Sequence, residues 1–316
     1  MFRTATSLAV LFLLVGISAS AAPVLPGHAL ITNGDAILEY DMAGQLVQSI
    51  PIDPPNGSSV FGTDVAVDQS GRVHVMNFPQ SFYAIHQAHL STYDPAGGTW
   101  EHNTISGWSL AAVTYYGSIG IGKDYVFAPD QNVGGGSGSG IIRFPLNDLG
   151  APERFSVGGR HAVEVGLNGY VYHLDRNGNL SYYHPDTMEL IRSFGFGKVY
   201  HGASVTNVAV AANGYIYTTD LNGSVHYHDD NAELIKSVPG YGGDIEVTPD
   251  GSVILASDND LVVADPSLTN FTSYDTIATG RNWIGSTTPV PEPSAFVLLA
   301  VGALGLGARA WRNRRR

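Results

Sequence analysis

Short runs of apolar, β-branched and aromatic residues recur along the middle of the chain, and Asn-Gly or Asp-Gly pairs separate many of them. Runs of about four to eight such residues, bounded by these dipeptides, predict antiparallel strands joined by tight turns. No stretch of the body shows the period of an amphipathic helix. The pattern therefore predicts an all-β body.

The strand pattern is an internal repeat, which is the feature to seek first in such a chain. Residues 163–175 align with residues 208–220 after a shift of 45, and Val-x-Val, Asn-Gly-Tyr and a final Asp are common to both segments. The frame continues into Glu-Leu-Ile-Arg-Ser at 189–193 and Glu-Leu-Ile-Lys-Ser at 233–237. Each unit is thus predicted to be a meander of four antiparallel strands.

Weaker copies fill the rest of the body and bring the number of units to six. A short polar residue ends the predicted second strand of each copy, at Asn33, Asn77, Asp130, Asp175, Asp220 and Ser257. First strands are predicted at residues 64–68, 111–115, 162–166, 207–211 and 244–248. The first copy has no first strand, whereas Asn282-Trp-Ile-Gly285 follows the sixth copy as an orphan. A ring in which the last strand completes the first unit explains both facts.

These features predict a six-bladed β-propeller of four-stranded antiparallel blades, closed by a C-terminal strand that completes blade one. The body resembles the superfamily of six-bladed propellers that includes NHL-repeat proteins and gluconolactonase-like lactonases. The resemblance covers Ala29 to about Thr287 and rests on the repeat pattern, so it implies a fold and no activity.

The N-terminus has the features of a secretory signal peptide. One positive charge at Arg3 precedes an apolar run, and small residues at Ala19 and Ala21 suit a signal peptidase. We expect cleavage after Ala21, which predicts a signal peptide over residues 1–21, a propeller over 22–288 and a separate C-terminal segment over 289–316.

The C-terminal segment reads Val290-Pro291-Glu292-Pro293-Ser294, then an uncharged apolar stretch, then a cluster of five arginines from Arg309 onward. This order resembles the PEP-CTERM sorting signal of exported proteins from exopolysaccharide-producing Gram-negative bacteria. The resemblance implies processing near Pro291, Glu292 and Pro293 by an exosortase, a membrane-embedded cysteine peptidase-transpeptidase. It also implies a short transmembrane helix that anchors the chain transiently in the inner membrane before the body reaches the periplasm, outer surface or extracellular matrix. A plain tail anchor is the alternative.

Composition excludes several classes of function. The chain has no cysteine, so disulfides, thiol nucleophiles and cysteine-ligated zinc are excluded. With the terminal segments set aside, 10 basic residues face 27 acidic ones, a net charge near −17. A body this acidic is a poor partner for nucleic acid or anionic lipid, so contact with the membrane is expected only through the sorting helix.

The face formed by first-strand starts and second-strand ends is predicted to collect polar residues around the channel. Asp64, Asn207 and Asp244 supply oxygen atoms there, with His161 nearby, and could hold Ca²⁺ or another divalent cation. The lactonase-like families place a metal at a mouth of this kind. The alternative is structural, because Asp and Asn at strand ends cap backbone N–H groups in Asx turns.

Two long loops on the same predicted face interrupt the repeat. Residues 78–89 carry aromatic and histidine side chains, and residues 131–140 are rich in glycine. Insertions on one face of a ring often mark a binding surface. The candidate ligand-binding residues are Phe78, Phe82, Tyr83, His86, His89 and His161. The alternative is that the aromatic residues merely cover a blade edge.

Catalytic motifs are scarce. His74, His173 and His226 are predicted to pack within strands, and His184 and His228 to occupy turns; none forms a compact metal-binding motif. The sequence therefore favours a non-catalytic exported module that binds a glycan, a peptide or an extracellular matrix protein. The alternative is a metal-dependent hydrolase of the lactonase type or a propeller lyase. Under either hypothesis, signal peptidase and exosortase are the expected processing partners of the chain.

Overall fold

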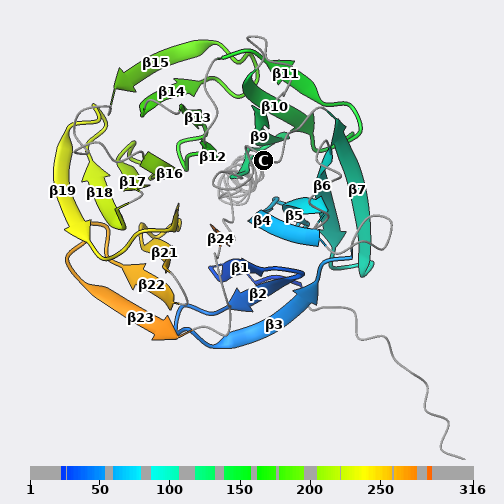
Figure 1. Ribbon diagram of the computed structural model, residues 1–316, viewed down its shortest axis with the longest axis horizontal. Coiled ribbons are helices and arrows are strands. Elements are labelled where there is room, and N and C mark those ends of the chain that lie inside the picture. Colours follow the sequence, from blue (N-terminus) through cyan, green and yellow to red (C-terminus); the bar gives the residue numbers. More distant parts are fainter. Residues whose placement is uncertain are drawn as a thin grey trace, which may run out of the picture.

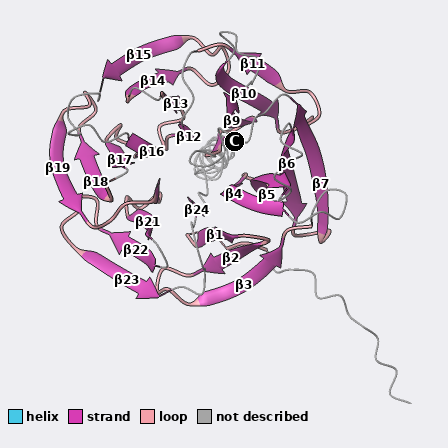
Figure 2. Ribbon diagram, viewed as in Figure 1, coloured by secondary structure: helices cyan, strands magenta, loops and turns pink. Residues whose placement is uncertain are grey.

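The computed structural model describes residues 23–25, 27–53, 60–79, 87–106, 118–131, 139–157, 162–175, 178–195, 205–220, 222–257, 260–275 and 283–286. These residues form six sheets of four antiparallel strands, arranged as a ring about a central axis (Figures 1 and 2). The prediction of a six-bladed β-propeller is confirmed. Within the described residues, no helix is long and apolar enough to cross a membrane.

Each blade uses four strands that run outward from the channel in chain order, except in blade 1. Blade 1 contains β1 (Ala29–Asn33), β2 (Ala36–Tyr40), β3 (Leu46–Pro51) and β24 (Trp283–Ser286); blade 2 contains β4 (Val60–Val67), β5 (Val73–Pro79), β6 (Gln87–Asp94) and β7 (Thr99–Ser106); blade 3 contains β8 (Gly120–Ile121), β9 (Tyr125–Gln131), β10 (Ser139–Pro145) and β11 (Glu153–Phe155). Blade 4 contains β12 (Ala162–Val165), β13 (Val171–Leu174), β14 (Asn179–Tyr183) and β15 (Leu190–Gly195); blade 5 contains β16 (Val205–Val210), β17 (Ile216–Asp220), β18 (Ser224–His228) and β19 (Leu234–Pro239); blade 6 contains β20 (Asp244–Val247), β21 (Val253–Ser257), β22 (Asp260–Ala264) and β23 (Phe271–Asp275).

The ring is closed by its last strand. β24 pairs antiparallel with β1, so that Ser286 lies opposite Ala29 and Trp283 opposite Thr32. Blade 1 therefore combines three strands from the start of the body with one from its end, as the orphan segment at 282–285 predicts. The closure leaves β1 with a neighbour on both sides.

The first strand of blade 3 differs from the prediction. Its place next to β9 is taken by the short strand β8, Gly120–Ile121, and not by residues 111–115, which lie outside the described residues. Gly120 has a physical reason to be there, because a Cβ atom at this position would overlap the backbone nitrogen of Val165 in the next blade. Two innermost strands approach closely at this position, which requires glycine. This first strand therefore lacks the β-branched pattern that marks the others.

Tight turns connect the first and second strands where the sequence carries Asn-Gly or Asp-Gly. Gly169, Gly214 and Gly251 occupy equivalent turns of blades 4, 5 and 6 with φ of 85°, 86° and 89°. Glycine adopts this left-handed region without steric cost. These glycines explain why the dipeptides recur at the period of the blade.

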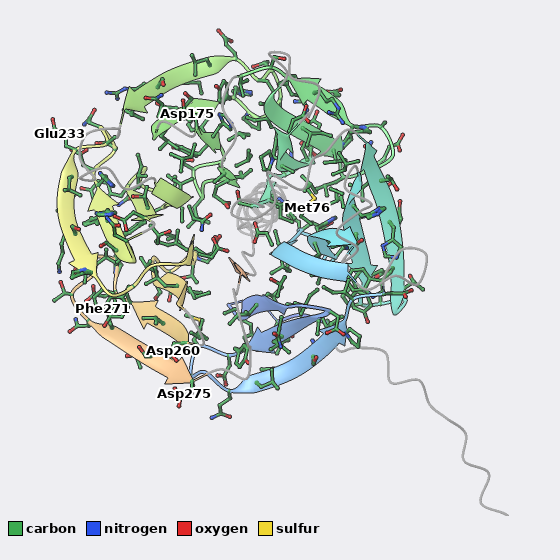
Figure 3. All side chains as sticks on the ribbon, viewed as in Figure 1. Met76, Asp175, Glu233, Asp260, Phe271 and Asp275 are labelled. Carbon is green, nitrogen blue, oxygen red and sulfur yellow. The ribbon has the colours of Figure 1, made fainter. Side chains whose placement is uncertain are left out.

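The hydrophobic core lies between neighbouring blades. Met76 and Leu90 of blade 2, for example, pack in one cluster with Val126 and Ile142 of blade 3, and all four side chains are fully buried. Figure 3 shows Met76 inside the ring, whereas Glu233 and Asp275 lie on its outer edge. Burying a side chain of this size contributes about 1.5–3 kcal/mol. Face-to-face packing of the blades is therefore the main stabilising contact in the ring.

Buried histidines complete polar networks inside the blades. The His74 ring lies between Asp68 Oδ2, at 3.0 Å from Nε2, and Thr92 Oγ1, at 2.9 Å from Nδ1. His226 Nε2 contacts Asp220 Oδ2 at 3.1 Å. The prediction of packing roles for these mid-strand histidines agrees with the structure. The sequence predicts His228 in a turn, but it is a fully buried residue at the end of β18, because it pairs with Ile216 as Tyr183 pairs with Val171 in blade 4.

The outermost strands of blades 4 and 5 carry exposed apolar pairs, Leu190-Ile191 and Leu234-Ile235. Each pair lies at a β-bulge, where the register shifts opposite Tyr182 and Tyr227 respectively. A bulge places two consecutive side chains against one partner residue and disturbs the hydrogen-bonding edge. The bulges therefore reduce the tendency of these edges to pair with another chain.

Candidate functional site

A cavity of about 380 Å³ lies in the central channel. Its wall is made by the first strands of blades 2 to 6 and by the turns that follow those strands in blades 3 to 6. The described lining holds six acidic residues, Asp64, Asp124, Glu164, Asp186, Asp244 and Glu246, and one basic residue, Lys123. The described lining is therefore predominantly acidic, in line with the acidic body.

The residues at the start of the first strands connect neighbouring blades. Asp64 of blade 2 accepts a hydrogen bond through Oδ2 from the backbone amide of Ile119 in blade 3. Ser118 Oγ of blade 3 accepts one from the amide of Val163 in blade 4, at 2.8 Å. Asn207 Nδ2 of blade 5 donates to the carbonyl oxygen of Gly243, next to blade 6, at 3.2 Å. The innermost strands are thus joined by side-chain to backbone bonds.

Asp64 and Asp244 also bind the backbone of their own strands. Asp64 Oδ1 accepts from the amide of Val65 at 2.8 Å, and Asp244 Oδ1 accepts from the amide of Ile245 at 3.0 Å. Burial raises the pKa of Asp64 well above its usual value, and the nearby charge of Asp244 raises it further. Backbone amides therefore use both oxygens of Asp64, which agrees with the structural interpretation of this residue.

The structure places all three predicted metal ligands, Asp64, Asn207 and Asp244, in the wall of the cavity. In the described part of the chain, no group of three or more histidine or acidic side chains is arranged to hold a metal ion. The metal site stays a prediction, and so does the hydrolase that would depend on it.

Two carboxylates on the innermost strands were missed from the sequence, as were Asp124 and Asp186 in turns of the cavity wall. Glu164 and Glu246 are the third residues of β12 and β20, and both line the cavity. Glu164 Oε1 accepts from the amide of Val165 at 2.8 Å. Burial raises the pKa of Glu164 well above its usual value, and the charges of Glu246 and Asp64 raise it further. The sequence signal is a glutamate in the middle of a four-residue strand whose neighbours are valine or isoleucine.

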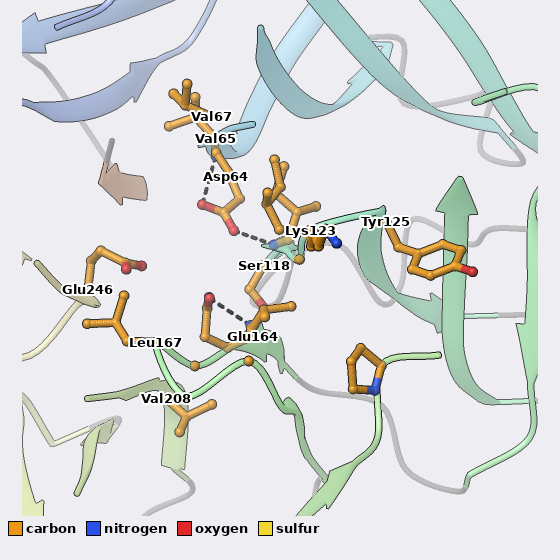
Figure 4. A pocket seen from close by; sticks show the side chains of 18 of the residues that line it. Asp64, Val65, Val67, Ser118, Lys123, Tyr125, Glu164, Leu167, Val208 and Glu246 are labelled. Carbon is orange, nitrogen blue, oxygen red and sulfur yellow. Dashed lines mark hydrogen bonds between the residues drawn. The ribbon is translucent and has the colours of Figure 1, made fainter. Parts of the chain in front are cut away.

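The carboxylates of the innermost strands come from alternate blades. Blade 2 contributes Asp64, blade 4 contributes Glu164, and blade 6 contributes Asp244 and Glu246. Blades 3 and 5 carry small uncharged residues at the same two strand positions, Ser118 and Gly120 in one and Asn207 and Ala209 in the other. Figure 4 shows Asp64, Glu164 and Glu246 around the same space. Carboxyl groups thus surround the channel from three directions.

The polar residues at second-strand ends have structural roles. Asp175 Oδ1 accepts from the amide of Asn179 at 2.8 Å, and Asp220 Oδ1 accepts from the amides of Asn222 and Ser224 at 2.9 and 3.0 Å. These are turn-capping bonds of the kind that Asp favours. In blades 2 and 3 the equivalent residues bind side chains instead: Asn77 donates to Ser91 Oγ, and Asp130 accepts from Arg154.

The predicted ligand-binding face is described only in part. Phe82, Tyr83, His86 and His161 lie outside the described residues, and Phe78 belongs to β5. His89, in β6, is buried, with Nδ1 at 3.2 Å from Thr104 Oγ1, and burial together with His102 lowers its pKa. His89 therefore faces the interior of its blade. The rest of this face stays a prediction.

Comparisons with known proteins agree with this picture. The PEP-CTERM protein-sorting motif matches residues 289–316, which include Pro291, Glu292 and Pro293. No curated protein matches the sequence. Among solved structures, the WD40 β-propeller domain of Doa1 is similar with a TM-score of 0.51 and 11% identity over 79% of each chain. Apo AztD from Citrobacter koseri is similar with a TM-score of 0.46 and 9% identity, over 81% of this chain and 97% of that one.

The fold and the motif together define a class of protein. The chain is a six-bladed β-propeller with a PEP-CTERM sorting motif, which indicates an exported protein that is transiently anchored in the membrane and processed by an exosortase. The similarity to the Doa1 domain lies far below 25% identity and shows the fold alone.

Proposed function

We propose that the exported propeller is a non-catalytic binding protein of the cell envelope that takes a small ligand into its central channel. The observation that carries this proposal is the cavity of about 380 Å³ enclosed by the innermost strands. Cavities of about 300–1,000 Å³ suit small molecules, whereas a folded partner needs a broad surface.

The position of the cavity relative to the chain ends supports a role in the envelope. The cavity reaches the turns that follow the first strands, such as the turn at Gly166 and Gly169. β24 occupies the place of a first strand in blade 1, so Ser286 ends at the same face of the ring. The sorting motif begins at residue 289. The cavity therefore reaches the face of the ring at which β24, the last described strand, ends.

Blocking the cavity tests the proposal. Ala212 is an exposed turn residue in the cavity wall, so Ala212→Trp should narrow the cavity without disturbing the core. Ala151→Trp, at an exposed turn of blade 3 that is absent from the described lining, is the matched control. A panel of amines, sugars, uronic acids and divalent cations would be screened against the body, residues 22–288, by thermal shift.

The expected result is a ligand-dependent rise in Tm that Ala212→Trp abolishes and Ala151→Trp retains. A rise that survives Ala212→Trp would place binding elsewhere on the protein and contradict the proposal. No response to any probe would contradict it as well.

A further inference from the structure

Carboxylates outnumber basic groups in the described lining of the channel. Asp64 of blade 2, Glu164 of blade 4, and Asp244 and Glu246 of blade 6 line the cavity, and Lys123, in the turn after β8, is the one basic residue of the described lining. Carboxylates that lie close together in a buried cavity disfavour one another's ionised forms, so such groups bind protons or take up a positively charged ligand. The raised pKa values of Asp64 and Glu164 indicate the first of these responses, proton binding, in the free protein.

Asn207 gives an independent indication of a ligand. It is 5% exposed and lines the cavity beside β20. Its Nδ2 donates to the carbonyl oxygen of Gly243, which fixes the orientation of the amide. Its Oδ1 is buried and accepts no hydrogen bond from any described residue. A buried acceptor without a donor costs about 1–3 kcal/mol, so a ligand that brings an N–H donor is favoured at this place.

The cavity therefore offers acceptors and negative charge, and the complementary group is a cation with several donors. A primary ammonium carries one positive charge and three N–H donors. A metal ion suits the site less well. Backbone amides already use both oxygens of Asp64, and the described residues contain no grouping suited to an ion.

We propose that the channel binds an organic ligand through a primary ammonium group, with Glu164 and Glu246 as its counter-charges and Asn207 Oδ1 as a further acceptor. This inference rests on the proposed function and names the chemistry of its ligand. The volume of the cavity leaves room for the remainder of an amino sugar or a short polyamine.

Calorimetric titration of the body with two matched sugars tests the charge requirement. Glucosamine carries the ammonium, whereas N-acetylglucosamine has the same ring without the charge. We expect at least tenfold tighter binding of glucosamine, and putrescine in a third titration separates a polyamine from an amino sugar as the source of the ammonium. Binding should release protons, because a bound cation favours the ionised carboxylates. Titration in two buffers of different ionisation enthalpy measures that release.

Two substitutions locate the site. Glu164→Gln removes the charge but keeps an oxygen that can accept from the Val165 amide, and it should weaken binding of the ammonium probe at least tenfold; Glu246→Gln should do the same. Glu189→Gln, at an exposed turn of blade 4, is the matched control and should bind as the native protein does.

The outcomes separate this inference from the proposed function. Equal binding of glucosamine and N-acetylglucosamine, native affinity in both glutamine variants, or binding of Ca²⁺ or Zn²⁺ alone would overturn the ammonium site while leaving a channel ligand in place. Failure of all probes to bind would contradict both proposals.

Discussion

Asp64 in the second blade accepts a hydrogen bond from the backbone amide of Ile119 in the third. The same carboxylate accepts from the amide of Val65 in its own strand. One side chain therefore fixes the separation of two innermost strands at the wall of the channel. Ser118 repeats this arrangement between the third and fourth blades.

We predict that Asp64→Ala destabilises the ring. The substitution leaves the buried amides of Ile119 and Val65 without their acceptor, at about 1–3 kcal/mol each. Urea unfolding at pH 7 measures the loss, and Ser118→Ala should give a smaller one because it frees a single amide. Asp148→Asn, at an exposed turn, is the control. If Asp64→Ala unfolds at the native urea midpoint, the inter-blade bond does not stabilise the ring.

We predict that removing the closing strand destabilises the protein far more than removing the sorting motif. A chain that ends at residue 280 lacks β24 and exposes the edge of β1, whereas a chain that ends at residue 288 keeps β24 paired with β1. Both truncations remove the segment at 289–316. Thermal unfolding compares the two, and equal midpoints would mean that the ring does not need its closing strand.

We predict that Glu164→Gln stabilises the ligand-free protein at neutral pH. Burial raises the pKa of Glu164. A raised carboxyl pKa means that the native state binds its proton more tightly than the unfolded chain does. This contribution is present below the unfolded pKa and is lost as pH rises through the folded pKa. The variant should therefore exceed the native protein in unfolding free energy at pH 7, where the carboxylate is ionised in the unfolded chain, and should match it near pH 4. Urea midpoints at the two pH values check this, and a variant no more stable than the native protein at pH 7 would contradict it.

We predict a loss of stability in acid that depends on His173. Burial lowers the pKa of this histidine to about 4. A histidine whose pKa is lowered in the native state stabilises that state at pH values above its unfolded pKa of about 6.5. This stabilisation, up to about 3 kcal/mol, is lost as pH falls toward 4. His173→Thr copies the residue at the equivalent position of blade 5, Thr218, and should remove much of this pH dependence. Denaturant midpoints at pH 7.5 and 4.5 check it, with His184→Asn as the more exposed control.

We predict that the mature protein from its native host lacks the arginine tail. The sorting motif at 289–316 includes Pro291 to Pro293, where an exosortase is expected to act. Intact-mass measurement should find a C-terminus near that motif. Recovery of the chain through Arg316 from a host with an active exosortase would contradict this prediction.

The blade count and the closure could be predicted because they depend on turn chemistry and strand number. Asn-Gly pairs at Gly169 and Gly214 impose a left-handed turn that few residues adopt, so the period survives in the sequence. The orphan strand before residue 286 needs a strand to pair with, and the first blade lacks a first strand.

The channel carboxylates were harder to predict, because alternate side chains of a strand lie on opposite sides of the sheet and the sequence does not say which side faces the channel. The starts of the first strands share a polar character that identifies Asp64, Asn207 and Asp244, whereas Glu164 and Glu246 lie inside their strands, where the sequence pattern gives them no distinct role. Blade 3 was misplaced for a related reason, because Gly120 at a close backbone contact carries no hydrophobic signal. In both cases the deciding information is the distance between neighbouring blades.

The pairing of β24 with β1 sets the order in which the exported chain can complete its fold. Ala29 emerges from the export machinery early, but its partner Ser286 arrives only when little more than the sorting motif remains to be transferred. During that interval the edge of β1 has no neighbour on its channel side. The ring can therefore close only after almost the whole body has been exported, because its last strand lies directly before the sorting motif.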